Sequence, residues 1–293
     1  MAMAMNLKTW MLVSGVATLF IGGAAAALRH GNRRSRRHTD VLRASLDAER
    51  VAVRPAEYDP RELDGLPAPV QRYFQAALGP VRRRLAALTL KQIGSFNLSE
   101  SAERWRPFAA TQRVVLQRPG FDWFARIGFA PFLSVHVNDT YLAGQGHLRA
   151  ALSGLIMLAD IGDTPEMAQG ELMRFLAEAP WYPTALLPSQ GVRWQEVDDR
   201  SAVATLQDGT IQVTLLFRFN PDGLIDSVHA DARGRMLNGG VVPTPWEGRW
   251  WGYAQRDGMQ VPLSCEVTWI TPEGPKPYFR GHVTLVAYEW AGA

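Results

Sequence analysis

Residues 211–219 read IQVTLLFRF, with apolar and polar side chains in alternation. One face carries Ile211, Val213, Leu215, Phe217 and Phe219, and the other carries Gln212, Thr214, Leu216 and Arg218. Successive side chains of a strand point to opposite faces, so this pattern predicts a half-buried β-strand. The turn-forming residues Asp208-Gly209 precede it and Asn220-Pro221-Asp222-Gly223 follow it. The stretch therefore predicts an antiparallel meander.

The same pattern of strands and tight turns recurs along the chain. Asp257-Gly258 and the TPEGP run at 271–275 are further turns. Such runs give about five strands before residue 160 and about seven after residue 190. A sheet of that size must curl, split or close. We expect a mainly β fold with few helices (α+β), in which a large curved antiparallel meander sheet or half-barrel holds helices in its concave face.

The segment DTPEMAQGELMRFLAEAP, 163–180, predicts the main internal helix. Asp163 or Thr164 would cap it, and Pro180 would end it. Its apolar stripe is Ala168, Leu172, Phe175, Leu176 and Ala179, and Glu171, Arg174 and Glu178 lie on the neighbouring face. Trp181 and Tyr182 follow directly, and we expect them at the rim of the sheet with their polar atoms bonded. This helix would fill the hollow of the sheet.

Residues 10–28, WMLVSGVATLFIGGAAAAL, are 19 residues without a charge. As a helix they would span the ~30 Å hydrocarbon core of a bilayer, so we expect one transmembrane helix after a tail at 1–9. A cleaved signal peptide is the alternative. Ser14, Thr18, Gly22 and Ala26 recur every four residues, a pattern typical of close helix pairs, and a homodimer through this helix is a second expectation.

An arginine-rich neck follows the apolar segment. Lys8 and the eight arginines up to residue 54 face three acidic residues, a surplus of six, whereas the whole chain has a formal net charge of +3. The positive-inside rule places the large domain in the cytoplasm, at the inner membrane. Arg33, Arg34, Arg36 and Arg37 are candidates for contact with anionic lipid, or serve only as a topology signal. The rest of the chain is slightly acidic, so no nucleic-acid partner is predicted.

The neck and connector should cover 29–59, and one β-rich domain should cover 60–290. The stretch TDVLRASLDAERVAV, 39–53, has a polar, helical pattern, and YDPRELDGLPAP marks the start of the folded domain. PVQRYFQAAL, 69–78, then predicts a short amphipathic helix that Gly79-Pro80 ends.

Sequence motifs of the common catalytic sites are missing. The chain has no H-E-x-x-H, G-x-S-x-G or G-x-x-x-x-G-K motif, and Cys265 is its single cysteine. His30 and His38 belong to the neck, and the other four histidines lie singly on predicted strands, His229 near Asp231 among them. We therefore predict no catalytic residue, no metal and no cofactor, and a buried structural thiol at Cys265.

The run PWEGRWWGY, 245–253, gives the main candidates for ligand binding. Trp246, Trp251 and Arg249 would line an apolar pocket with a charged end, or fill the core of the sheet. With Asp231 and Arg233 they would hold an anionic head group. The full set of candidates is Glu171, Arg174, Phe175, Trp181, Tyr182, Asp231, Arg233, Trp246, Arg249 and Trp251.

Four passages resemble a bacterial family of unknown function: LPAPVQRYFQAAL (66–78), GELMRFLAEAPWYPTALLP (170–188), VRWQEVDDRSAVATL (192–206) and DGMQVPLSCEVTWITPEG (257–274). The resemblance covers about residues 60–290 and implies no catalytic residue. A curved sheet with internal helices is also distantly similar to the LolA and LppX lipoprotein carriers, which hold acyl chains between sheet and helices. Those carriers work outside the cytoplasm, opposite to the orientation that the arginines predict.

Three functions remain open at this point. The first is a membrane-anchored protein that binds a lipid-like or other apolar ligand between the sheet and the internal helix. The second is an enzyme acting on an amphiphilic substrate, with Glu171, Asp231 or His229 as acid or base. The third is an interaction module without a ligand, which a solid core would favour.

Overall fold

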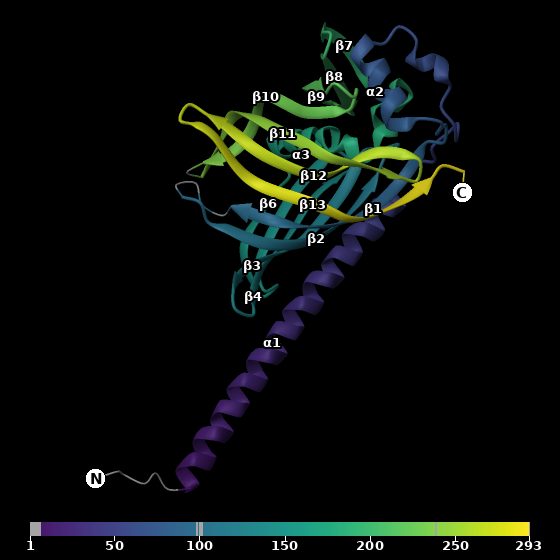
Figure 1. Cartoon of the computed structure of the whole chain (residues 1–293). Helices are drawn as coiled ribbons and strands as arrows, with labels where there is room; N and C mark the ends of the chain where they lie inside the picture. Colours follow the sequence, from purple (N-terminus) through teal and green to yellow (C-terminus); the bar gives the residue numbers. More distant parts are fainter. Residues whose placement is uncertain (1–6, 98, 100–101, 238, 293) are drawn as a thin grey trace.

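The chain folds around a single antiparallel sheet. The computed structural model describes the backbone of residues 7–97, 99, 102–237 and 239–292, and side chains from residue 22 onward. Within these residues, thirteen strands pair in the order β6-β5-β4-β3-β2-β1-β13-β12-β11-β10-β9-β8-β7 (Figure 1). The strands are β1 Leu85–Asn97, β2 Trp105–Val115, β3 Gly120–Ala130, β4 Leu133–Leu142, β5 Gln145–Leu152, β6 Ile156–Gly162, β7 Arg193–Asp198, β8 Ser201–Asp208, β9 Ile211–Phe219, β10 Ile225–Leu237, β11 Gly240–Arg256, β12 Met259–Thr271 and β13 Gly274–Trp290.

The strand order divides the sheet into two arms. From β1 the chain meanders outward to the edge strand β6, and from the opposite edge strand β7 it meanders back to β13, which pairs with β1. The connection between the two edges contains α3, Pro165–Ala177, and the short 3-10 helices η2 Ala179–Trp181, η3 Pro183–Leu186 and η4 Pro188–Gln190. This connection crosses one face of the sheet, and the sheet curves around it (Figure 1).

Side-chain contacts between the arms show how far the sheet curls. The Tyr141 hydroxyl on β4 donates to an Asp208 carboxylate oxygen on β8, at 2.8 Å, although the two strands belong to opposite arms. On β9, Val213, Leu215 and Phe217 are buried and Gln212 is exposed, as the alternation predicts. The mainly β class and the curved antiparallel sheet are therefore confirmed.

Helix α3 fills the hollow of the sheet. Thr164 caps it by accepting a hydrogen bond from the Met167 amide, and the expected apolar stripe is buried. The expected position of Trp181 and Tyr182 at the rim is wrong, because both are buried in the core. The Trp181 indole donates to the Pro262 carbonyl at 3.0 Å, and the Tyr182 hydroxyl donates to the Phe175 carbonyl at 2.7 Å. The two 3-10 turns after α3 bring these rings inward.

One end of the half-barrel is covered by a short helix. Helix α2, Ala68–Leu78, follows the 3-10 turn η1, Pro60–Leu63, and ends at Gly79, whose φ of 52° suits glycine. The ring of Tyr73 packs against Phe219, with centroids 5.8 Å apart. In an antiparallel sheet alternate turns share one end, so the β2–β3, β4–β5 and β11–β12 turns lie at this covered end. The β1–β2, β3–β4, β5–β6, β10–β11 and β12–β13 turns lie at the other end.

The outer face of one arm carries the long helix α1, Leu7–Ala48. Its contact residues recur every four positions, which places them on one stripe. The hydroxyl of Ser35 lies 2.8 Å from His136 Nδ1, Asn138 donates to Thr39 at 3.0 Å, and Arg43 pairs with Asp122 at 2.8 Å. Burial raises the pKa of Asp122, and the charge of Arg43 opposes this rise. The polar connector expected at 39–53 is thus helical up to Ala48 and docks by a polar seam.

The membrane segment expected at 10–28 forms part of α1, which projects beyond the sheet (Figure 1). In the part of the chain that the structure describes, no helix is long and apolar enough to cross a membrane. Most of 10–28, including Ser14 and Thr18 of the small-residue pattern, lies outside the residues with described side chains. The transmembrane helix and the helix-mediated dimer therefore stay predictions.

The closest approach of α1 to the sheet is at Gly31. A Cβ atom there would lie 2.1 Å from the Ser153 carbonyl oxygen, and the backbone would have to move. We predict that Gly31→Ala lowers the free energy of unfolding by about 1 to 3 kcal/mol, the usual cost of overpacking. Limited trypsin digestion of the full chain should also cut faster at the arginines of 29–37, because the seam opens.

Gly23→Ala is the matched control, since no atom lies within 4 Å of a Cβ built at Gly23. It should not lower the unfolding free energy, because alanine is the better helix former, and it should leave the digestion rate unchanged. Equal behaviour of the two variants would show that α1 does not depend on this contact.

Candidate functional site

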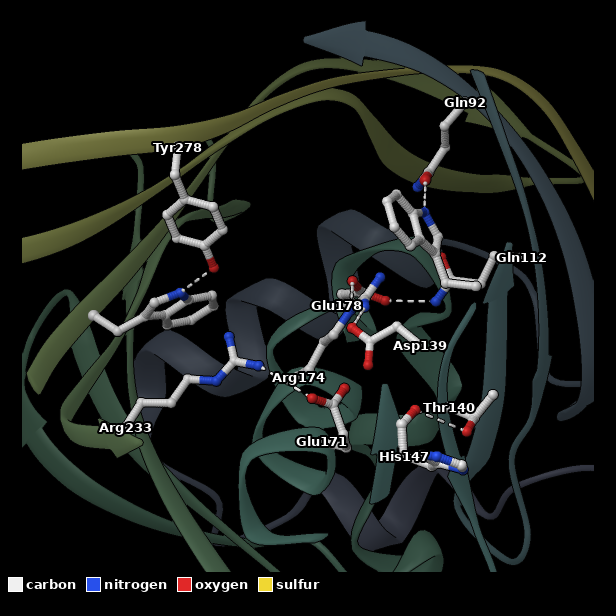
Figure 2. Close-up of polar contacts among 12 residues, drawn as sticks. Gln92, Gln112, Asp139, Thr140, His147, Glu171, Arg174, Glu178, Arg233 and Tyr278 are labelled. Carbon is white, nitrogen blue, oxygen red and sulfur yellow. Dashed lines mark hydrogen bonds and ion pairs between the residues drawn. The ribbon is translucent and has the colours of Figure 1, made fainter. Parts of the chain in front are cut away.

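Five charged side chains meet on the inner face of the sheet. Glu171 and Arg174 project from α3, Glu178 from its C-cap, Asp139 from β4 and Arg233 from β10, and we call them the charged cluster (Figure 2). The spacing of three and four residues puts the α3 members on one face of the helix. On β4, alternation sends Asn138 to the α1 side and Asp139 to the α3 side. Sheet and helix thus bring charges together inside an otherwise apolar core.

Arg174 is the centre of the cluster. Its guanidinium donates to Glu178 at 2.7 Å and to Asp139, and it lies 4.9 Å from the ring centroid of Phe121. The Gln112 amide donates to the second Glu178 oxygen at 2.6 Å. Burial alone would lower the pKa of Arg174, but the neighbouring carboxylates raise it. Arg174 therefore stays charged while it is buried.

Glu171 is the least satisfied member of the cluster. It is 4% exposed, and its nearest cation is Arg233, with Oε1 and Nη2 3.7 Å apart. Among the described residues, Glu171 Oε2 and Asp139 Oδ1 are buried without a hydrogen-bond partner. Burial raises the pKa of Glu171 to about 8, with Asp139 adding to the rise and Arg233 opposing it. The raised pKa favours the protonated form of Glu171.

The charges of the cluster balance only when one carboxyl is protonated. Asp139, Glu171 and Glu178 oppose the two guanidiniums of Arg174 and Arg233. With Glu171 protonated, the remaining two carboxylates match the two arginines. The cluster therefore has room for one more positive charge or hydrogen-bond donor, and not for an added anion.

An irregularity in β10 turns Arg233 inward. The pairing of β10 with β11 shifts register between Ala230 and Arg233, which is the geometry of a β-bulge. Arg233 lies 5.1 Å from the ring centroid of Trp246, whereas the Asp231 side chain is fully exposed. The bulge separates two residues that the sequence places side by side.

Aromatic rings line the inner face at the end of the sheet away from α2. We call Phe96, Trp246, Trp269, Tyr278 and Phe279 the aromatic mouth; Trp246 is buried and the other four are half-buried. Trp269 stacks on Tyr278 at 5.6 Å, Phe96 meets Tyr278 edge-on at 5.7 Å, and the Trp246 indole donates to the Tyr278 hydroxyl at 3.0 Å. Trp246 links the aromatic mouth to Arg233, as Figure 2 shows with Tyr278 above Arg233.

The structure divides the predicted ligand-binding residues into three groups. It brings Glu171, Arg174, Arg233 and Trp246 together. It places Phe175, Trp181 and Tyr182 in the packed core. It leaves Asp231, Arg249 and Trp251 exposed on the other face of the sheet, apart from the first group. The anionic head group expected near Asp231, Arg233 and Arg249 is therefore not supported, because these side chains do not converge.

Trp251 borders a groove of about 520 Å³ on the outer face, where Ile93, Glu266, Arg280 and His282 also lie. Ile93 follows Gln92, whose side chain accepts a bond from the inner Trp123 indole, so Ile93 faces outward. This groove is a second place where an apolar molecule could lie.

The acid–base pair suggested for an enzyme is divided between the two faces. His229 lies 3.3 Å from Asp231 and 4.0 Å from Glu247, all outside the hollow that holds Glu171. Within the described ranges, no group of three or more His, Cys, Asp or Glu side chains is arranged to hold a metal ion. Cys265 is buried, as expected, and burial raises the pKa of its thiol.

Sequence reasoning missed Asp139 and most of the aromatic mouth. The sequence did indicate that Asp139 faces inward, because it alternates with the apolar residues Val137 and Tyr141 along β4. The inward turn of Tyr278 had none, since it follows from a register shift between β12 and β13. The lipid-contact candidates Arg33, Arg34, Arg36 and Arg37 are all exposed on α1.

The raised pKa of Glu171 makes the stability of the fold depend on pH. A carboxyl whose pKa rises from 4.5 to about 8 on folding stabilises the fold below the lower value, and this contribution is lost as the pH rises through the higher one. We predict that wild type loses on the order of 3 kcal/mol more than Glu171→Gln between about pH 5 and about pH 9. Urea unfolding at the two pH values measures this difference.

Glu166→Gln is the control, because Glu166 is an exposed carboxyl on the first turn of the same helix. It should keep the pH dependence of wild type. If Glu171→Gln also keeps it, Glu171 is ionised in the folded protein and the charge balance described above is wrong.

Comparison with known proteins gives a family and two distant structural similarities. Residues 64–288 match the family described as "Family of unknown function (DUF6920)", and no curated protein matches. A LolA superfamily protein from Nitrosomonas europaea is similar at a TM-score of 0.40 and 10% identity, over 75% of this chain and 92% of that chain. A porin-like protein from Bacteroides uniformis is similar at a TM-score of 0.22 and 9% identity, over 70% of this chain and 96% of that one.

The distant structural similarity to a LolA-type protein that the sequence predicts is thus found. The family match runs from the residues before α2 into β13 and so includes strands β1 to β12, most of β13, the charged cluster and the aromatic mouth. The chain belongs to this family of unknown function.

Proposed function

We propose that the aromatic mouth binds an amphiphilic, lipid-like ligand and that the charged cluster receives its polar head. The observation that carries this proposal is that the buried ring of Trp246 contacts both the half-buried Tyr278 and Arg233 of the charged cluster, which holds unsatisfied carboxylate oxygens. Apolar walls with a few polar groups at one end are typical of ligand sites.

The apolar part of the ligand would lie against the rings. Trp269, Tyr278 and Phe279 keep part of their surface exposed although they face the inside of the curved sheet. Covering apolar surface contributes about 25 cal/mol per Å², so an acyl chain gains most where large rings are still exposed. The centre of the hollow offers less, because Trp181, Tyr141 and other large side chains fill it.

The polar head would carry a hydrogen-bond donor or a positive charge. Glu171 Oε2 and Asp139 Oδ1 each accept no hydrogen bond from the described residues. An amine or hydroxyl group would satisfy them, and a cationic amine would replace the proton of Glu171 in the charge balance. A carboxylate head would leave the cluster with a surplus negative charge even when Glu171 is protonated. We therefore propose an amine or hydroxyl head in place of an anionic one.

Native mass spectrometry of the full chain released from detergent, followed by organic extraction, tests the proposal. We expect a stoichiometric amphiphile with an amine or hydroxyl head in wild type. Trp269→Ala removes a wall of the aromatic mouth and should lower the bound fraction several-fold, since large aromatic side chains carry much of the energy of such contacts.

Trp251→Ala is the matched control, because Trp251 is a half-exposed tryptophan in the outer groove. It should keep the ligand. Loss from Trp251→Ala with retention by Trp269→Ala would move the site to the outer groove. An apo mass from folded wild type would favour an interaction module without a ligand.

We also propose that residues 10–28 anchor the protein once in the inner membrane, with the sheet in the cytoplasm. The support is the uncharged segment, the helical backbone of α1 through it, and the exposed arginines that follow. An extracytoplasmic domain, as in lipoprotein carriers, is the alternative.

Fusing a compartment-sensitive reporter after Ala293 distinguishes the two orientations. We expect a reporter that matures only in the cytoplasm to be active, and an alkaline phosphatase reporter to be inactive, because the arginine-rich flank stays on the cytoplasmic side. The opposite pattern would place the sheet outside the cytoplasm. Recovery of the protein in the fraction without membranes would refute the anchor.

A further inference from the structure

Two neighbouring turns carry a group of exposed apolar side chains, among them the most exposed of the large ones in the described residues. Phe132 in the β3–β4 turn is 93% exposed, Ile156 after the β5–β6 turn is 61% exposed, and Leu158 is 56% exposed. Phe129 at 49% and Leu155 at 38% lie beside them. We call these five residues the apolar tip.

The two turns lie side by side at the same end of the sheet. The Ser153 amide donates to the Ser134 carbonyl at 2.6 Å, and Val135 pairs with Leu152. Exposed apolar side chains gathered in one patch mark an interaction surface more often than scattered ones do. The apolar tip is such a patch.

The backbone at Phe132 supports a role for its ring. Phe132 has a φ of 64°, in the left-handed region that favours glycine or asparagine. A bulky residue in this conformation, with almost no contact to the rest of the protein, adds nothing to the stability of the turn. Such strain is retained where the side chain acts on something else.

Helix α1 passes directly beside the apolar tip. At Gly31 its backbone approaches Leu155 so closely that a Cβ atom would lie 2.8 Å from the Leu155 side chain. The uncharged segment 10–28 ends three residues before Gly31. From Gly31 toward its N-terminus, α1 projects away from the sheet (Figure 1). The point where α1 would enter a membrane is therefore next to the apolar tip.

Positive charges surround the same place. Arg29, Arg33, Arg34, Arg36 and Arg37 are exposed on α1, and Arg126 is exposed on the outer face of β3. Apolar side chains flanked by arginines match the layers of an anionic bilayer surface, where the rings enter among the acyl chains and the guanidiniums meet the phosphates.

We propose that the apolar tip inserts into the surface of an anionic lipid bilayer beside α1, with the arginines on the head groups. This membrane contact goes beyond ligand binding by the aromatic mouth, and it takes from the proposed anchor only the position of the bilayer. Contact through the unpaired edge of β6 with a second copy is the competing outcome of the test.

Fluorescence quenching in lipid nanodiscs tests the contact on the full chain. Cys265 is buried, so a thiol-reactive environment-sensitive dye should label only an introduced cysteine. Phe132→Cys and Ile156→Cys report on the apolar tip, and Ala24→Cys reports on the proposed anchor. Asp222→Cys is the matched control, since Asp222 is exposed in the β9–β10 turn, at the end of the sheet next to α2.

In nanodiscs of phosphatidylcholine and phosphatidylglycerol with doxyl-labelled acyl chains, we expect loss of emission at positions 132 and 156 and no loss of emission at position 222. Replacing phosphatidylglycerol by phosphatidylcholine should weaken the quenching, because the arginines lose their anionic partners. Loss at 132 and 156 supports the proposal whether or not position 24 is quenched.

Quenching at position 24 without quenching at 132 and 156 would overturn the proposal that the apolar tip enters the bilayer. The proposed anchor at 10–28 would remain supported. No quenching at any of the three positions would overturn both. A blue shift of the dye emission at position 156 without quenching by the labelled lipid would show that a second copy of the protein covers the apolar tip. This outcome also overturns the proposal.

Discussion

The fold depends on one topological constraint, the crossing from edge strand β6 to edge strand β7. The first arm ends at one edge of the sheet and the second arm begins at the other, so the chain between them has to cross a whole face. Helix α3 makes this crossing, and its apolar stripe is buried only because both arms bend toward it. The hydrogen bond from Tyr141 to Asp208 joins the arms over this connection. Curvature, core and inner face all follow from the need to enclose a helix that links two distant edges.

The same crossing explains why charges lie inside the protein. Eight of the 13 residues of α3 are buried, and the side chain of Arg174 on the same helix is only 13% exposed. A buried ion pair seldom adds stability relative to apolar side chains of similar size, because desolvation offsets the Coulomb attraction. Replacing a buried ion pair by apolar side chains of similar volume is often neutral or stabilising. The retention of a surplus carboxyl at Glu171 is therefore better explained by recognition than by stability, and this favours a site for a polar head over a purely structural cluster.

The sequence predicted local structure well and long-range relations poorly. Alternation identified β9, and the capping and proline signals gave α3 within a few residues, because these depend on neighbours along the chain. The placement of Arg233 inside and Asp231 outside depends on a bulge against β11, which local alternation does not reveal. Trp181 is buried because 3-10 turns redirect the chain after α3, and a rule based on helix ends does not anticipate this. The polar seam of α1 was missed because its stripe resembles a solvated helix until the matching residues on β3 and β4 are known.

The direction of the strands relates the inner site to the proposed membrane surface. In this antiparallel sheet the β1–β2 and β12–β13 turns, which flank the aromatic mouth, lie at the same end as the β3–β4 and β5–β6 turns of the apolar tip. The opposite end is covered by α2. Helix α1 is bound to the outer face of the sheet by Ser35, Thr39 and Arg43 and has no break. The angle between the axis of α1 and the end of the sheet that carries the aromatic mouth is therefore fixed. A lipid-like molecule that left the bilayer beside α1 would meet the apolar tip first and the aromatic mouth next, and its head would reach the charged cluster last. A mouth at the α2 end would require the same molecule to cross the length of the sheet through water.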